Sequence, residues 1–160
     1  PLLTETCNYD FGDHFFAITS SASQLASADI RIGTNATDAE GDISDSGAAL
    51  DDTTGANDED LTMPSFTVGS ATNLVIPVTV TPANLSGSTA RINVFVDWNG
   101  DGDVADMNET LTAQTVSATG NITFALTPPV GTTAGTKYVR IRVTEFNGRI
   151  YDQLIAKAPG

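Results

Sequence analysis

The chain has 160 residues, which is enough for one domain that buries a core without disulfides. Its 20 acidic and 7 basic residues give a formal net charge of −13. This charge excludes nucleic acid as a natural partner, because no basic patch can neutralise phosphates, and it disfavours an anionic membrane surface. The sequence has no apolar run of about 18 residues, so we expect no membrane insertion.

Residues 1–64 show little apolar periodicity, and we expect a loop-rich acidic segment that packs on the remainder of a single domain, 1–160. Within this segment, 9–18 and 30–33 are candidates for short strands. Cys7 is the only cysteine, so an internal disulfide is impossible. The chain begins at Pro1 without a signal-type apolar segment, and we expect it to be a piece of a larger protein.

Acidic residues then gather between positions 38 and 60, interleaved with Gly, Ser, Thr and Ala. Composition alone predicts a disordered acidic linker over 34–60. The competing interpretation is a segment ordered by metal, because Asp51-Asp52 and Asp58-Glu59-Asp60 would repel one another without a cation. Both interpretations stay open at this stage.

From residue 65 onward the sequence is typical of an all-β core, with short apolar runs separated by turn residues. The expected strands are 65–68, 73–80, 89–97, 110–116, 120–126, 136–145 and 149–156. Strands of this length and spacing predict an antiparallel β-sandwich, Ig-like or jelly-roll-like, with its core in 65–160.

Two strands carry further information. Pro77 has no backbone N–H, which predicts an edge strand or a bulge at 73–80. In 136–145 we expect Val139, Ile141 and Val143 to face the core and the intervening arginines to face outward. The dipeptide Asn147-Gly148 predicts a hairpin that joins this strand to 149–156.

The stretch 97–103 carries oxygen-bearing side chains at every second position, and Gly102 lies where the chain must turn sharply. This pattern is that of a calcium-binding loop, in which side-chain oxygens and the backbone carbonyl of Asp103 surround the ion. An EF-hand would place its closing Glu where this chain has Asn108, so Asp106 or Glu109 would have to supply the closing ligand. The preceding segment predicts a strand, so the helix-pair switch of EF-hand sensors is not expected. The alternative is an acidic hairpin turn, but a turn requires only two residues.

Other chemistry finds little support in the sequence. His14 is the only histidine, so neither a zinc cluster nor a hydrolytic triad is indicated. Paired carboxylates can hydrolyse glycosides, but these acidic clusters lie in Gly- and Ser-rich stretches without aromatic residues to hold a sugar. We therefore expect no enzyme. Trp98 is either a core anchor or a contact for a partner, and an isopeptide bond from Lys137 or Lys157 stays open.

The segment 94–103, followed by Asn108-Glu109, resembles the core motif of the GEVED domains of bacterial cell-surface and secreted proteins. Three further stretches resemble the same family in the same order: 10–13, the acid-bearing residues between 32 and 60, and 130–142. The chain ends at Gly160 without the Gly-Glu-Val-Glu-Asp-Tyr signature strand. The expectation is a trimmed end or a strand supplied by another chain.

The resemblance implies an extracellular β-sandwich from an adhesin-like surface protein, with calcium bound and no known chemistry. Scarce Cys and Lys, and the millimolar calcium outside cells, favour the same location. The expected function is a calcium-stabilised structural or adhesive module, and the alternative is a calcium-dependent module that binds a carbohydrate or protein ligand. The expected partners are neighbouring domains of the same surface protein, and a glycan or protein ligand. The predicted calcium ligands are Asp97, Asn99, Asp101, Asp103, Asp106 and Glu109, joined at one end of the domain by Asp10, Asp13, Asp58 and Asp60.

Overall fold

The computed structural model describes residues 9–10, 24–25, 29–35, 61–81 and 89–146, and within these ranges every helix or strand assigned is a strand. The prediction of an all-β fold is therefore confirmed. The strands are β1 (Tyr9–Asp10), β2 (Gln24–Leu25), β3 (Ile30–Ile32), β4 (Thr72–Val80), β5 (Thr89–Asp97), β6 (Gln114–Val116), β7 (Gly120–Leu126) and β8 (Tyr138–Phe146). No helix in the described part of the chain is long and apolar enough to cross a membrane.

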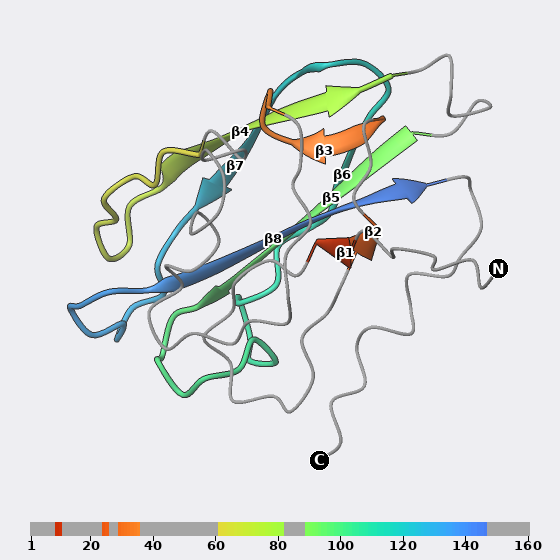
Figure 1. Cartoon of the computed structure of the whole chain (residues 1–160). Coiled ribbons are helices and arrows are strands. Elements are labelled where there is room, and N and C mark those ends of the chain that lie inside the picture. The colour runs from red at the N-terminus through yellow and green to blue at the C-terminus, as the bar shows by residue number, and fades with distance from the viewer. Residues whose placement is uncertain (1–8, 11–23, 26–28, 36–60, 82–88, 147–160) are drawn as a thin grey trace, which may run out of the picture.

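Two antiparallel three-stranded sheets face each other, one ordered β3-β4-β7 and the other β6-β5-β8 (Figure 1). The edge strands β3 and β8 contact each other across the core. The small pair β1-β2 is also antiparallel. This arrangement agrees with the predicted sandwich.

The core lies between the two sheets because alternate residues of β4, β5 and β7 point inward. The burial pattern of β5 alternates strictly from Thr89 to Val96. Burying a Val, Leu, Ile or Phe side chain is worth about 1.5–3 kcal/mol. The buried apolar residues are Leu74, Ile76, Val78, Val80, Ala90, Ile92, Val94, Val96, Trp98, Ile122, Phe124, Leu126 and Val143.

The structure departs from the predicted strands in two places. Residues 65–68 form no strand, although Phe66 packs against the core. The predicted strand 110–116 is regular only over β6, although Thr110 forms an isolated bridge with Phe95. Between that bridge and β6 the register against β5 shifts by one residue, so the segment holds one extra residue, as in a β-bulge.

Pro77 does not mark an edge, because β4 lies between β3 and β7. The sequence prediction was wrong here, and the reason is local. Gly33 donates its N–H to the carbonyl of Pro77 (2.8 Å), but proline has no N–H to return. The hydroxyl of Thr79 donates to the Gly33 carbonyl instead, at 2.7 Å. A side chain thus supplies the hydrogen bond that proline cannot, just where β3 ends.

In β8 the prediction is confirmed, since Val143 is buried and Val139 and Ile141 pack against the core while the arginines alternate with them. The expected partner strand 149–156 lies outside the described residues.

The loops 61–71, 97–109 and 127–137 gather at one end of the sandwich (Figure 1). Gly69 donates its N–H to the carbonyl of Pro128 (3.0 Å), which ties the first loop to the third. The rings of Phe66 and Trp98 meet edge to face, with centroids 5.4 Å apart, which ties the first loop to the second. This end carries the candidate site.

Candidate functional site

The loop 97–109 leaves β5 at its last residue and returns to pair with the same strand. Val96 donates its N–H to the carbonyl of Glu109 (2.8 Å), and Leu111 donates to the carbonyl of Val94 (3.0 Å). Both ends of the loop are therefore attached to the central strand of a sheet, which limits its freedom.

The first carboxylate of the loop, Asp97, is only 1 % exposed and binds the loop backbone. Gly100 donates its N–H to Asp97 Oδ1 (2.6 Å), and Gly102 donates to Asp97 Oδ2 (3.1 Å). Both glycines have positive φ, 80° and 89°, where a residue with a Cβ is strained. The chain can curl around Asp97 because these two positions are glycine.

The last carboxylate of the loop, Glu109, is also 1 % exposed and accepts three backbone N–H groups. Trp98 and Asn99 donate to Oε1 at 3.0 and 3.4 Å, and Asp106 donates to Oε2 at 3.2 Å. Burial raises the pKa of Glu109, as does the nearby charge of Asp97, whereas the three backbone N–H groups oppose that shift. Glu109 thus fastens the start of the loop to its end.

The exposed oxygen-bearing residues form a series of short turns, each side chain accepting the N–H two residues later. Asn99 Oδ1 accepts from Asp101 (3.0 Å), Asp101 Oδ1 from Asp103 (3.1 Å), and Asp103 Oδ1 from Ala105 (2.9 Å). Asx turns of this kind wind the backbone tightly. The every-second-residue spacing seen in the sequence is the spacing of these turns.

Two carboxylate oxygens converge on one point of the loop. Asn99 donates Nδ2 hydrogens both to Asp101 Oδ2 (2.8 Å) and to Asp106 Oδ2 (2.6 Å). The side-chain nitrogen therefore lies between two negative charges that would otherwise repel each other. A small cation with oxygen ligands would satisfy the same two carboxylates.

The donor set fits Ca²⁺, because it is made entirely of carboxylate, amide and backbone oxygens, the ligands that this ion prefers. Asp101 and Asp106 would supply carboxylate oxygens to such an ion, whereas Asn99 would have to turn its amide, since it presents Nδ2 to both carboxylates and its Oδ1 accepts the N–H of Asp101. The oxygens of Asp97 lie at the start of the same turn and accept the N–H groups of Gly100 and Gly102. Within the described ranges, no three His, Cys, Asp or Glu side chains already form a group of metal-binding dimensions.

The remaining predicted ligands are not brought to this loop by the described part of the structure. Asp10 lies in β1, and its side chain is not described. Asp13, Asp58 and Asp60 lie outside the described residues.

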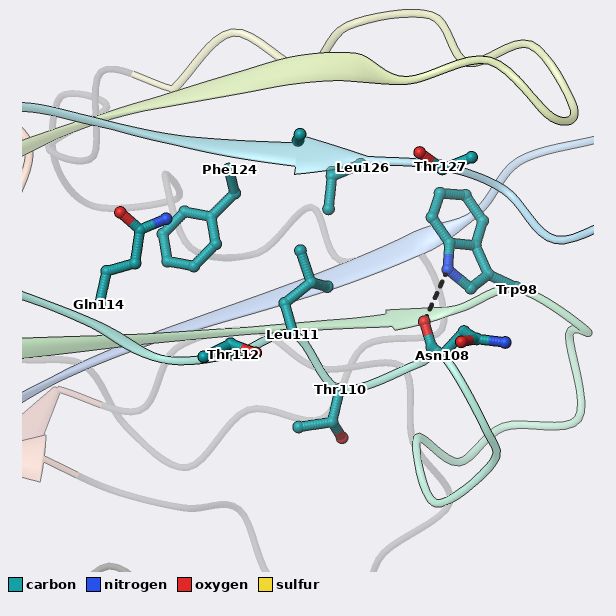
Figure 2. A pocket seen from close by; sticks show the side chains of 10 residues that line it. Trp98, Asn108, Thr110, Leu111, Thr112, Gln114, Phe124, Leu126 and Thr127 are labelled. Atoms are coloured by element: carbon teal, nitrogen blue, oxygen red, sulfur yellow. Dashed lines mark hydrogen bonds between the residues drawn. The ribbon is translucent and has the colours of Figure 1, made fainter.

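Trp98 is a core residue, since only 3 % of it is exposed. Its indole Nε1 donates to the carbonyl of Asn108 at 3.2 Å (Figure 2). Asn108 has a φ of 74°, a conformation that asparagine tolerates better than most residues. The sequence did not decide whether Trp98 is a core anchor or a contact for a partner. It did not predict the positive φ of Asn108 either, although asparagine before Glu109 is compatible with such a turn.

A groove of about 420 Å³ lies beside the loop, where the edges of β6 and β7 face each other. In Figure 2 the side chains of Leu111, Phe124 and Leu126 point toward one another, with polar residues around them. Gln114 donates its Nε2 to the carbonyl of Thr123 on the edge of β7 (2.9 Å). The groove was not predicted, because it depends on the spacing of two sheets. It is lined by Trp98, Asn108, Thr110, Leu111, Thr112, Gln114, Phe124, Ala125, Leu126 and Thr127.

Comparison with known proteins gives one family. Residues 91–155 match the family model of the GEVED domain. The matched region contains the entire loop 97–109 together with β6, β7 and β8. No curated protein and no solved structure matches the chain.

Proposed function

Because residues 91–155 match the family model of the GEVED domain and include the whole loop 97–109, we propose that the chain is a calcium-stabilised structural or adhesive module of an extracellular surface protein. The observation that supports this proposal best is the convergence of Asp101 Oδ2 and Asp106 Oδ2 on one nitrogen of Asn99. Two exposed carboxylates held this close favour a cation between them.

The loop is prepared for an ion by its own backbone. Asp97 and Glu109 are buried and accept five backbone N–H groups between them, and these hydrogen bonds hold the turns of the loop. An ion then adds binding free energy without having to order the chain first. At a hundred times its dissociation constant, it would stabilise the fold by about 2.7 kcal/mol.

The net charge of −13 supports the same proposal, since self-repulsion of this size destabilises a compact state unless cations bind. In this proposal the module has no catalytic role, and its partners are neighbouring domains of the same surface protein. Calcium at millimolar concentration outside cells is enough to fill a weak extracellular site.

The proposal is tested by thermal unfolding in millimolar CaCl₂ and in EDTA, with ionic strength held constant and MgCl₂ as the control for divalent screening. Calcium is expected to raise the Tm of the wild type by about 5–10 °C. The double substitution Asp101→Asn and Asp106→Asn keeps the shape of both side chains and should abolish the rise. Glu145→Gln, an exposed carboxylate on β8, is the matched control and should keep it. Equal Tm values with and without calcium, or a rise that survives the double substitution, would overturn the proposal.

The groove supports a second candidate function, a calcium-dependent module that binds a carbohydrate or protein ligand. Asn108 belongs both to the loop and to the lining of the groove, so an ion held by the loop would lie close to a bound ligand. Threonine, asparagine and glutamine at the rim offer hydroxyl and amide groups for hydrogen bonding. Binding to a glycan array that EDTA abolishes, and that Thr112→Val weakens without lowering the Tm, would favour this function. Retention of binding in EDTA would exclude it.

A further inference from the structure

The strand β7 lies at the end of its sheet. β4 pairs with one of its edges, and no strand in the described part of the chain pairs with the other. An open edge can pair with another chain, and proteins commonly prevent this with very short strands, charged side chains or proline. Among the other edge strands that the structure describes in the two sheets, β3 and β6 have only three residues and β8 carries arginines. β7 has seven residues, with no charge and no proline.

The hydrogen bonds of β4 show which backbone groups of β7 point to the open edge. Gly33 donates its N–H to the carbonyl of Pro77, and Thr81 donates to the carbonyl of Asp29, so odd-numbered residues of this segment face β3. Successive residues of a strand turn their backbone groups to opposite sides, so the even-numbered residues of β4 bond to β7, and their partners in register are also even-numbered. The odd-numbered residues of β7 therefore point to the open edge: Asn121, Thr123 and Ala125.

One of these edge groups has a side-chain partner. Gln114 on β6 donates its Nε2 to the carbonyl of Thr123 at 2.9 Å, across the side of the sandwich where β6 and β7 face each other. This bond agrees with the outward direction of the Thr123 carbonyl. Because an exposed hydrogen bond of this kind contributes little net free energy, a backbone N–H from another strand can replace it.

The surroundings of this edge carry no charge. The segments 61–81 and 110–136, which include β4, β6 and β7, contain no Asp, Glu, Lys or Arg, although the chain has a net charge of −13. Two copies of so acidic a chain repel each other unless they meet where charge is absent, and charges more than about 8 Å apart are largely screened at physiological ionic strength. Within the described ranges, the edge of β7 therefore lets two copies approach with little repulsion.

We propose that two copies of the chain pair antiparallel through β7, with Thr123 of one copy opposite the partner's Thr123. In this register Asn121 lies opposite the partner's Ala125, and every outward N–H and C=O group of the three odd-numbered residues gains a backbone partner. On the inner face, Ile122 lies opposite the partner's Phe124, so apolar side chains also meet. The sheets β3-β4-β7 of both copies then form one continuous sheet.

The symmetry of this register favours a second copy over an unrelated strand. The same three residues serve as both halves of the contact, so the edge is complementary to itself, and a two-fold contact of this kind closes at a dimer. The pairing uses no residue of the loop 97–109, so it is independent of the proposed calcium site.

The test is sedimentation equilibrium of the full chain in EDTA, which removes any contribution from calcium. The wild type is expected to show a monomer–dimer equilibrium, and the dimer fraction should rise with NaCl concentration because salt screens the repulsion between two acidic chains. A chain that stays monomeric up to submillimolar concentration, or that forms assemblies larger than a dimer, would overturn the proposal.

Substitutions at the centre of the contact locate it on β7. Thr123→Lys places two like charges directly opposite each other and should raise the dimer dissociation constant about tenfold or more. Thr115→Lys, the same change at an exposed threonine of β6, is the matched control and should not weaken the dimer. An equimolar mixture of Thr123→Lys and Thr123→Glu should recover dimers, because opposite charges then face each other. Gln114→Ala frees the Thr123 carbonyl in the monomer and should lower the dissociation constant about fivefold or more.

The Tm of each variant, measured at a concentration where the chain is monomeric, shows that it is folded. Equal dissociation constants for the wild type and Thr123→Lys, or a mixture of the Lys and Glu variants that stays monomeric, would contradict the two-fold register. If the wild type is monomeric and Thr123→Lys lowers the Tm relative to Thr115→Lys, another segment of the same chain covers β7, and the proposal is wrong.

Discussion

Replacement of Glu109 by alanine gives the sharpest prediction about how the loop is built. The carboxylate accepts three backbone N–H groups, of which the one from Trp98 is buried and the other two are partly buried. Losing a charged acceptor costs about 1.5–3 kcal/mol for the buried donor, and about 0.5–1 kcal/mol for each donor that water can reach. Glu109→Ala should therefore lower the free energy of unfolding by about 2.5–5 kcal/mol even without metal.

Urea unfolding in EDTA, followed by tryptophan fluorescence, measures this loss, because Trp98 is the only tryptophan and lies in the loop. Asp103→Ala is the matched control, since the Asp103 carboxylate is exposed and, among the residues that the structure describes, accepts only the N–H of Ala105. Its loss should cost less than about 1 kcal/mol. The reasoning is refuted if the two variants are equally stable in EDTA, or if Glu109→Ala is costly only when calcium is present. In that second case Glu109 would be a metal ligand and not a backbone anchor.

Three further predictions follow from the same contacts. Thr79→Val removes the hydroxyl that donates to the Gly33 carbonyl and should cost about 1 kcal/mol in urea unfolding, whereas Thr79→Ser should cost much less. Gly102→Ala should cost about 1–2 kcal/mol, because φ is 89° and an added Cβ meets nothing within 4 Å, so backbone strain alone is measured. Gly120→Ala, which has equal space and no such φ, should cost clearly less in the same assay. Burial raises the pKa of Glu109 above its ordinary value of 4.5, so the folded state binds more protons and wild-type stability should fall, relative to Glu109→Gln, as pH rises from 4.5 to neutrality in EDTA. A pH-independent difference between these two proteins would contradict that assignment.

The strands could be predicted from the sequence because their apolar residues alternate. In β5 the inward residues are Ala, Ile, Val and Val, and the outward ones are polar or aromatic, so one register buries the whole set. The loop 97–109 was also predictable, since Asx turns and positive-φ glycines leave a visible spacing of residue types.

Other features depend on contacts between segments far apart in the chain. Pro77 misled the prediction because the compensating hydroxyl of Thr79 acts on Gly33, a residue 46 positions away. The groove beside Trp98 results from two sheet edges whose separation no local pattern encodes. Arg142 Nε is buried without a hydrogen-bond partner on the outer face of β8, which alternation alone assigns to solvent.

The role of Glu109 shows what residue spacing can and cannot predict. Its position in the chain suggested a closing metal ligand, and the structure places it at the end of the loop as expected. Its two oxygens, however, accept backbone N–H groups from Trp98, Asn99 and Asp106. Spacing identified the residue, but only the fold shows which atoms its carboxylate contacts.

Calorimetric titration of the protein with CaCl₂ tests the central claim most directly, because it measures binding without reference to stability. The account predicts a calcium-binding isotherm for the wild type and for Glu145→Gln. Substitution of both Asp101 and Asp106 by asparagine should remove the binding due to the loop. Identical isotherms for the wild type and the double variant, or no binding at millimolar calcium, would contradict the account.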